Sequence, residues 1–173
     1  MIYFLFIIFA LVLTFVAMQF IAVIFRGYAP FVSSNHSLIE TIAKDLTLKP
    51  TDVVYELGAG DAPLLLELSH RFPNNKYVGL ENAFFSWLLG QIQLKVHKSK
   101  IILLWKNFYK VNISEATHIY CYLNVGTMKK LEEKFKAECK PGTIIISHTF
   151  KLPSYTPTKT INIEGDEILY YKI

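Results

Sequence analysis

Two glycines and three acidic residues stand in the sequence at spacings that suit the binding of a nucleotide. Gly58 and Gly60 are separated by one residue, and Asp61 follows directly. Glu56 lies two residues before Gly58, and Glu81 lies 21 residues after Gly60. A glycine turn lets the backbone approach a ligand closely, and an acid about 20 residues further on can bind ribose hydroxyls. These residues therefore predict a nucleotide pocket.

The residues on either side of this turn predict the two elements that position it. Residues 53–57 contain β-forming side chains and no turn residue, which is typical of a buried strand. After the turn, apolar side chains recur at helical spacing at Leu64, Leu65, Leu68 and Phe72. The turn thus lies at the carboxyl end of a strand, where open α/β sheets bind their ligands.

The remainder of the chain continues this alternation of strands and helices. Strands are expected over residues 76–81, 100–105, 117–123 and 143–147, helices over residues 83–96 and 126–138, and a hairpin around residues 164–167. The pattern predicts an α/β fold with a Rossmann-like, doubly wound sheet and a C-terminal antiparallel hairpin. This domain is expected to occupy residues 51–173.

The first part of the chain differs sharply in composition. Residues 1–25 contain no charge, no proline and no glycine. A helix of that length would span about 36 Å, more than the roughly 30 Å of bilayer hydrocarbon. A cleaved signal peptide would show a basic start, a shorter apolar core and a small-residue cleavage site, and none of these occurs. The segment therefore predicts one N-terminal transmembrane helix that is retained as an anchor.

Basic residues after the anchor predict its orientation. Arg26, Lys44 and Lys49 follow the apolar segment, so the positive-inside rule places the following domain in the cytoplasm. Between anchor and domain, residues 26–50 are expected to form a linker and a short amphipathic helix whose cap lies near Ser34.

The overall composition narrows the choice of partners. The net charge of +4 is small and the lysines are scattered, so nothing indicates a nucleic-acid partner. The five histidines lack the spacing of a metal site, and the two cysteines suggest no disulfide framework. The expected partners are membrane lipid, through residues 1–25, and a substrate, with no metal.

Two residues near the turn distinguish between nucleotides. A dinucleotide fingerprint has its third glycine where Pro63 stands, and a P-loop is excluded because no Gly-Lys-Ser/Thr follows. The buried position of Glu56 costs several kcal/mol unless a partner pairs with it, and a cationic ligand with an amino group would do so. S-adenosylmethionine, which has an amino acid and a ribose but no pyrophosphate, therefore fits better than NAD.

The motifs resemble those of class I S-adenosylmethionine-dependent methyltransferases. The resemblance is most specific to the membrane-anchored protein lysine methyltransferases, which include enzymes acting on the ATP synthase c-subunit and the adenine nucleotide translocase. The blocks occur in the same order: APFVSSN, YELGAGDAP, GLEN, KNFYKVNI and LEEKFKAECKPGTIIISHTFKLPSYTP. This resemblance covers nearly the whole chain, and it implies a lysine acceptor in a membrane-associated protein.

The resemblance also implies which residues bind the cofactor, namely Glu56, Gly58, Gly60, Asp61, Glu81, Asn82 and Asn107. Glu81 is expected to accept hydrogen bonds from the ribose hydroxyls and to make few contacts with the core. Asn107 stands where the family has an aspartate near the adenine.

The methyl acceptor is expected to enter a channel at the end of the fourth strand. Topology and resemblance place Tyr122, Leu123 and Asn124 along this channel, with Tyr122 and Asn124 as the candidate catalytic residues. Phe31 and Phe150 are expected to help close it. An apolar, aromatic channel favours loss of the lysine proton because it penalises the ammonium form.

Two alternatives remain open from the sequence alone. Ala62 and Pro63 replace a glycine and an arginine of the family pattern, and Asn107 replaces its aspartate. These departures are compatible with a non-catalytic binding or scaffold protein on a decayed methyltransferase fold. The second alternative is a NAD-dependent oxidoreductase, against which Glu56 and Pro63 argue.

Overall fold

The computed structural model describes residues 2–26, 36–163 and 165–173, and the chain divides into two units, Met1–Val32 and Ser33–Ile173. The first unit contains helix α1 (Ile2–Arg26), whose described side chains are those of residues 3–15. Within the part of the chain that is described, no helix is long and apolar enough to cross a membrane. The anchor expected over residues 1–25 therefore stays a prediction.

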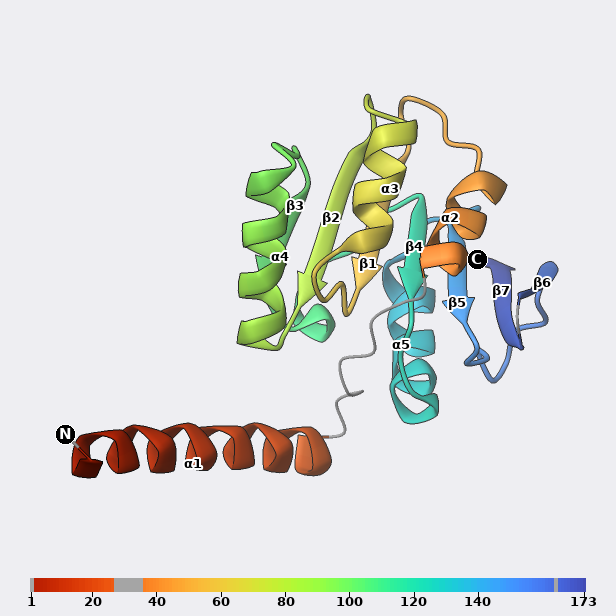
Figure 1. Ribbon diagram of the computed structural model, residues 1–173. Helices are drawn as coiled ribbons and strands as arrows, with labels where there is room; N and C mark the ends of the chain where they lie inside the picture. The colour runs from red at the N-terminus through yellow and green to blue at the C-terminus, as the bar shows by residue number, and fades with distance from the viewer. Residues whose placement is uncertain (1, 27–35, 164) are drawn as a thin grey trace. The chain divides into compact units, whose positions relative to one another are not determined.

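The second unit is built on a seven-stranded sheet with the order β3-β2-β1-β4-β5-β7-β6 (Figure 1). The strands are β1 (Val53–Leu57), β2 (Lys76–Glu81), β3 (Ile102–Trp105), β4 (His118–Cys121), β5 (Ile144–His148), β6 (Lys159–Ile163) and β7 (Asp166–Lys172). The first five strands pair in parallel, whereas β7 is antiparallel to both β5 and β6. The Rossmann-like sheet with an antiparallel C-terminal hairpin is thus confirmed.

The strand order reverses direction between β1 and β4. From β1 the chain moves outward through β2 to β3, and it then returns to place β4 on the other side of β1. Such a switch point opens a crevice at the carboxyl ends of the two strands, where doubly wound folds bind ligands. The glycine turn follows β1, so this topology places it at the crevice.

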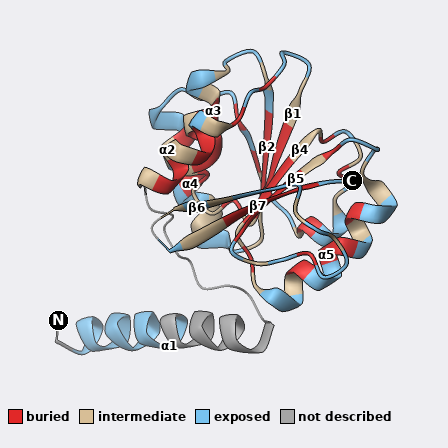
Figure 2. Cartoon of the chain, turned by 90° about the vertical axis from the view of Figure 1, so that its right-hand side faces the viewer, coloured by how far each residue is buried: buried red, intermediate tan, exposed pale blue. Residues whose placement is uncertain are grey.

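Helices cover both faces of the sheet (Figures 1 and 2). Helices α2 (His36–Asp45), α3 (Pro63–Arg71) and α4 (Phe84–Val96) lie on one face, and α5 (Val125–Glu138) lies on the other. The first layer buries the apolar stripe expected from the sequence, with Leu65 and Leu68 fully buried, and the second buries Met128, Leu131 and Phe135. Each such side chain contributes about 1.5–3 kcal/mol by leaving water.

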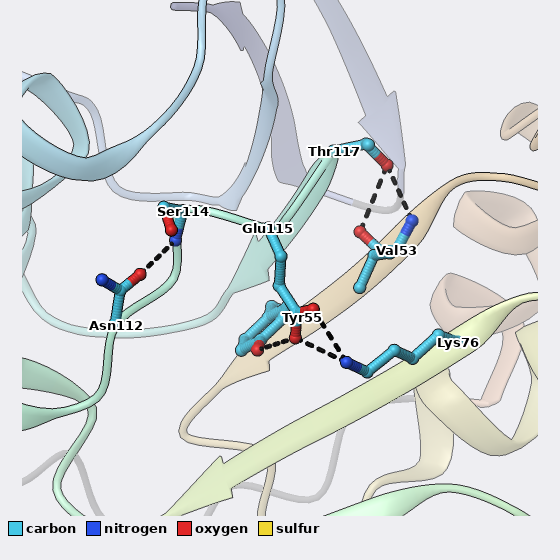
Figure 3. A network of polar contacts seen from close by, with 7 residues as sticks. All are labelled: Val53, Tyr55, Lys76, Asn112, Ser114, Glu115 and Thr117. Atoms are coloured by element: carbon cyan, nitrogen blue, oxygen red, sulfur yellow. Dashed lines mark hydrogen bonds and ion pairs between the residues drawn. The ribbon is translucent and has the colours of Figure 1, made fainter.

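A cluster of polar contacts joins the amino ends of β1, β2 and β4 (Figure 3). The Glu115 carboxylate accepts hydrogen bonds from the Tyr55 hydroxyl at 2.7 Å and from Lys76 Nζ at 2.7 and 2.8 Å. The Thr117 hydroxyl accepts from the Val53 amide at 3.0 Å and also contacts its carbonyl oxygen. These contacts fix the last part of the β3–β4 connection, residues 106–117, where it enters β4 at the end of the sheet opposite the crevice.

The expected strands and helices are found, with shifted ends. The strand expected over residues 117–123 ends at Cys121, because the following residues turn away to begin α5. The strand expected over residues 100–105 begins at Ile102. The first shift matters for function, since it frees Tyr122 and Asn124 from the strand ladder at the crevice.

Candidate cofactor and acceptor site

The glycine turn after β1 requires backbone conformations that suit glycine. The angle φ is +77° at Gly58 and +56° at Gly60. The amides of Gly58 and Ala59 both donate to the carbonyl of Leu80 in β2, at 2.8 and 3.1 Å, which ties the turn to the neighbouring strand. A Cβ on Gly58 would also stand 2.9 Å from Cδ2 of Leu123. The left-handed conformation therefore favours glycine at position 58, and an added Cβ would also have to displace the flexible end of the Leu123 side chain.

Helix α3 begins directly after the turn, with a residue under strain at its cap. Ala62 is the N-cap residue, adopts a left-handed conformation with φ of +60° and is fully buried. An L-residue in that conformation costs about 1–2 kcal/mol, and alanine offers no side-chain cap. Pro63 occupies the first turn of the helix, where its fixed φ is acceptable. The substitution of Pro63 for a third glycine thus fits the start of this helix.

Glu56 is a buried acid in β1 that lacks a complete set of partners. The residue is 5% exposed, and its Oε2 has no hydrogen-bond partner among the described residues. Burial raises the pKa of this carboxyl well above its ordinary value, and the charge of Asp61 adds to the rise, whereas a hydrogen bond from the Leu65 backbone lowers it. An unpaired buried carboxylate is costly until a partner arrives. A ligand with a positive charge supplies that partner, so the site fits S-adenosylmethionine.

Glu81 holds the glycine turn against the end of β2. Its Oε2 accepts a hydrogen bond from the Gly60 amide at 2.8 Å, and its Oε1 accepts from the amides of Asn82 and Ala83 at 2.7 and 2.6 Å. These contacts are made with backbone amides of the turn and of the residues after β2, outside the apolar core, and the sequence did not predict them. They form because amides beyond the strand end lack ladder partners, and the carboxylate satisfies three of them. About one of its four acceptor sites is left for a ribose hydroxyl.

Asn82 and Asn107, which are also expected to bind the cofactor, follow the carboxyl ends of β2 and β3. The carbonyl oxygen of Asn82 accepts a hydrogen bond from Trp105 Nε1 at 3.0 Å. Asn107 Oδ1 accepts from the Tyr109 amide at 2.9 Å and so caps the short 3₁₀ helix Phe108–Lys110. A local capping role thus accounts for Asn107, and its contact with adenine stays a prediction.

An aromatic wall stands at the carboxyl ends of β4 and β5. The ring of Tyr122 stacks on that of His148 with centroids 3.9 Å apart, and it lies nearly parallel to the ring of Phe150 at 6.3 Å. Asn124 accepts a hydrogen bond from the Thr127 amide at 2.9 Å and caps α5. The structure therefore places Tyr122 in this wall. The side chain of Asn124 instead caps the amino end of α5.

His148 is the buried member of the wall, and the sequence did not single it out. Burial lowers the pKa of its imidazole, although Asp166, with Oδ1 3.5 Å from Nε2, opposes the shift. Its Nδ1 lies 3.4 Å from the Tyr120 hydroxyl. Its position in the sequence could have indicated a role in the site, because His148 is the last residue of β5, just as Glu81 is the last residue of β2.

Gly90 in α4 is a second residue that sequence reasoning missed. A Cβ at this position would stand 3.1 Å from both Asp61 Cα and the Gly60 carbonyl oxygen, and 2.5 Å from Leu103 Cδ2. The absence of a side chain therefore lets α4 press directly on the glycine turn. An isolated glycine within a helical pattern was the signal.

Two further observations delimit the site. Phe31, expected to close the channel, lies outside the described residues. A hollow of about 570 Å³ lies at the other end of α4, lined by residues such as Leu94, Lys95 and Ile101. That hollow faces the amino ends of the strands, so it is distinct from the crevice that holds the three acids.

Comparisons with known proteins agree with this geometry. A family model described as the ANTKMT methyltransferase domain matches residues 56–159. A protein-lysine N-methyltransferase of Saccharolobus islandicus (strain REY15A) is 27% identical over 139 residues, which cover 79% of this chain and 86% of that protein. The adenine nucleotide translocase lysine N-methyltransferase of Mus musculus is 24% identical over 152 residues, covering 86% of this chain and 65% of that protein.

Solved structures support the fold. The crystal structure of an RNA methyltransferase from Salinibacter ruber in complex with S-adenosyl-L-homocysteine superposes with a TM-score of 0.77 at 24% identity, covering 82% of this chain and 94% of that one. The family match runs from Glu56 through the glycine turn and the ends of β2, β4 and β5. It argues against the oxidoreductase alternative. The chain belongs to the ANTKMT methyltransferase domain family and is an S-adenosylmethionine-dependent methyltransferase.

Proposed function

We propose that this methyltransferase transfers a methyl group to a lysine side chain of a membrane-associated protein. Two relatives, from Saccharolobus islandicus and Mus musculus, are named as lysine N-methyltransferases, and the second acts on the adenine nucleotide translocase. The acceptor is thus proposed by relationship, and the aromatic wall gives it a physical basis.

The observation that carries this proposal is the stack of Tyr122 with His148 and Phe150. These rings line the ends of β4 and β5, beside the strand that carries Glu56. An aliphatic amine that enters such a surface loses water, which penalises its ammonium form and lowers its pKa. A neutral lysine amine is the nucleophile that the reaction needs, so an aromatic wall suits lysine better than an acidic acceptor.

The roles of the chain's own residues follow from their contacts. S-adenosylmethionine, when bound, supplies an electrophilic methyl group on a sulfonium. Glu56 would pair with a positive group of the cofactor, and the remaining acceptor site of Glu81 would take a ribose hydroxyl. Because Glu81 also fixes the turn through the Gly60 amide, it would set the position of the cofactor as well as bind it. Alignment and exclusion of water then provide most of the rate.

We further propose that residues 1–25 anchor the enzyme in a membrane with the methyltransferase domain on the cytoplasmic side. The apolar composition of this segment supports the anchor, and the basic residues Arg26, Lys44 and Lys49 that follow it support the orientation. An anchor raises the local concentration of a substrate in the same membrane.

The test is to incubate the full chain with labelled S-adenosylmethionine and host membranes, and to locate the label by mass spectrometry. We expect label on a lysine of a membrane protein, and much less label at limiting S-adenosylmethionine when Glu56→Gln replaces the wild-type chain. Label on nucleic acid, or on a protein residue other than lysine, would overturn the proposed acceptor. Extraction of the full chain from membranes by high salt alone would overturn the anchor.

A further inference from the structure

One continuous segment of the methyltransferase domain carries positive charge without any negative charge. Residues 82–114 contain five lysines and no aspartate or glutamate. The same segment contains both tryptophans of the chain, Trp87 and Trp105. It comprises α4, β3 and the 3₁₀ helix that follows, at one edge of the sheet (Figure 1).

The outward side of this segment is strongly apolar. Helix α4 is apolar on both sides: it buries Leu94 and Gly90 against the sheet, yet large apolar side chains also point away from it. We call this outer surface the α4–β3 face. Its exposed apolar members are Phe84, Phe85, Leu88, Leu89, Ile92, Val96, Ile102 and Trp105, with exposed fractions from 36% to 73%. Exposed apolar side chains gathered on neighbouring elements in this way are typical of an interaction site.

The aromatic rings of the face form an ordered cluster. The ring of Trp105 lies 5.0 Å from that of Phe84 and stacks at 6.0 Å on that of Trp87. Both indole N–H groups are satisfied by backbone carbonyls, Trp87 by Leu103 at 3.2 Å and Trp105 by Asn82 at 3.0 Å. Because these polar atoms already have partners, the rings can enter an apolar phase without leaving a donor unpaired.

Lysines occur along the same segment as the exposed apolar side chains. All five are exposed, and none of them forms an ion pair with any residue that the structure describes: Lys95, Lys98, Lys100, Lys106 and Lys110. The other charged helix surface differs, since on α5 Lys134 pairs with Glu138 and Lys136 pairs with Glu132. The positive charge of the α4–β3 face is therefore uncompensated.

We propose that the α4–β3 face is a docking surface for an anionic lipid bilayer. Aromatic and aliphatic side chains enter the boundary between headgroups and acyl chains, and the lysines meet anionic headgroups. Each lysine near such a surface contributes about 1 kcal/mol. This role belongs to the methyltransferase domain itself, and it depends neither on the identity of the acceptor nor on residues 1–25.

Charge distinguishes the bilayer from the other occupants. A second copy of the chain would bring five lysines against five lysines, which disfavours association. Helix α1 could cover apolar surface, but residues 1–25 contain no acid to neutralise the lysines. An anionic bilayer satisfies both the apolar surface and the charge.

Docking would also place the cofactor site at the membrane surface. Helix α4 touches the glycine turn at Gly90, and Trp105 contacts Asn82 directly beyond Glu81. The crevice therefore lies beside the docked face, within reach of residues that a membrane protein exposes at the headgroup level.

The two tryptophans provide a direct probe, because Trp105 lies on this face, the half-buried Trp87 stacks against it, and the chain has no others. The full chain is mixed with vesicles of phosphatidylcholine, with or without phosphatidylglycerol, in which the acyl chains are brominated. We expect bromine to quench tryptophan fluorescence in the anionic vesicles, and high salt to reduce the quenching.

Matched variants decide what causes the quenching. Leu89→Glu and the double variant Lys98→Glu/Lys100→Glu should lose most of it, whereas the exposed pair Lys129→Glu/Lys130→Glu on α5 should retain it. Equal melting temperatures and equal affinity for S-adenosylhomocysteine would show that the variants fold. Absence of quenching in anionic vesicles would overturn the proposal. So would quenching that is equal in neutral vesicles and insensitive to Leu89→Glu, since residues 1–25 alone would then bring the domain to the lipid.

Discussion

Two adjacent regions of the domain concentrate opposite charge. The crevice at the ends of β1 and β2 gathers the acids Glu56, Asp61 and Glu81, and the electrostatic effect of the other two reaches Glu56. The α4–β3 face next to it carries five lysines and no acid over residues 82–114. The small net charge of the chain conceals this separation.

The two regions also differ in how their charge meets solvent. Glu56 is buried and incompletely paired, so its charge is expensive and is stabilised only by a ligand of opposite sign. The lysines of the α4–β3 face are exposed and remain hydrated, so each contributes little alone and they act together on an extended anionic surface. Buried charge thus provides selectivity for a small cation, and exposed charge provides adhesion.

The largest expected effect comes from neutralising the buried acid. Glu56→Gln keeps the shape of the side chain but cannot pair with a cationic group. Hydrogen bonds to charged groups contribute about 1.5–3 kcal/mol, so the affinity for S-adenosylmethionine should fall by roughly tenfold to a hundredfold. Isothermal titration calorimetry measures this change.

The same substitution should stabilise the ligand-free protein at alkaline pH. The pKa of Glu56 is raised in the folded state, so the folded protein binds the proton of this carboxyl more tightly than the unfolded chain does. The resulting contribution to the free energy of unfolding is fully present below the ordinary pKa of a glutamate, and it is lost as pH rises through the raised pKa. Glu56→Gln removes this loss, and its melting temperature should exceed that of the wild type at pH 8.

Glu132 is the matched control for this prediction. It is also buried, but it accepts hydrogen bonds from the Ser154 amide at 2.9 Å and from Lys136 at 2.9 Å. Burial raises the pKa of its carboxyl, yet these bonds outweigh burial and the net shift is downward. Glu132→Gln should therefore lower the melting temperature at pH 8 and leave cofactor affinity unchanged. If Glu56→Gln and Glu132→Gln changed the melting temperature at pH 8 in the same direction, the proposed difference between the two buried acids would be contradicted.

An effect of similar size on affinity is expected at Glu81, the acid that clamps the turn. Glu81→Ala leaves the amides of Gly60, Asn82 and Ala83 without their acceptor, so it should weaken cofactor binding roughly tenfold to a hundredfold and also lower the melting temperature. Glu81→Gln keeps one acceptor oxygen and should lose less of both. A Glu81→Ala protein with unchanged melting temperature would contradict the clamping role.

A pair of helical glycines gives a smaller and more selective effect. Gly90→Ala places a Cβ 3.1 Å from the Gly60 carbonyl oxygen, so the turn must shift and cofactor affinity should fall several-fold. At Gly126 in α5, the nearest atom to an added Cβ is Asn124 Oδ1 at 3.5 Å, an ordinary contact. Gly126→Ala should therefore increase the free energy of unfolding by up to about 1 kcal/mol and raise the melting temperature. Its affinity for the cofactor should stay unchanged. Titration and melting curves of both variants check this.

The smallest effect is expected at the strained cap of α3. Ala62→Gly relieves a left-handed conformation worth about 1–2 kcal/mol but removes one buried methyl group worth about 0.8 kcal/mol. The two nearly cancel, so stability should change by less than about 1 kcal/mol. A large loss on chemical denaturation would mean that the methyl group, rather than the strain, dominates at this position.

The sheet and the position of the turn could be predicted because they depend on local patterns. The buried strand before Gly58 and the helical leucines after it are each visible within a few residues of sequence. The hairpin around residues 164–167 was equally predictable, since a glycine lies between two runs of β-forming residues. These elements were found at nearly the expected boundaries.

The details of the site could not be predicted because they depend on contacts between distant segments. The amides that Glu81 accepts from lie on two different connections, so its clamping role requires knowledge of how the turn approaches β2. The role of Gly90 likewise depends on how α4 packs on the turn. His148 becomes part of the site only through the stacking of Tyr122, a contact across 26 residues of sequence.

The most direct test of the cofactor site is to count the protons released when S-adenosylmethionine binds, by calorimetry in buffers of different ionisation enthalpy. A cationic ligand that pairs with Glu56 must bind its ionised form, so binding should drive off the proton that burial holds there. We predict net proton release by the wild type at pH values below the raised pKa of Glu56, and no such release by Glu56→Gln. Equal proton release by the two proteins, or none by the wild type at any pH above the ordinary pKa of a glutamate, would contradict the pairing of Glu56 with the cofactor.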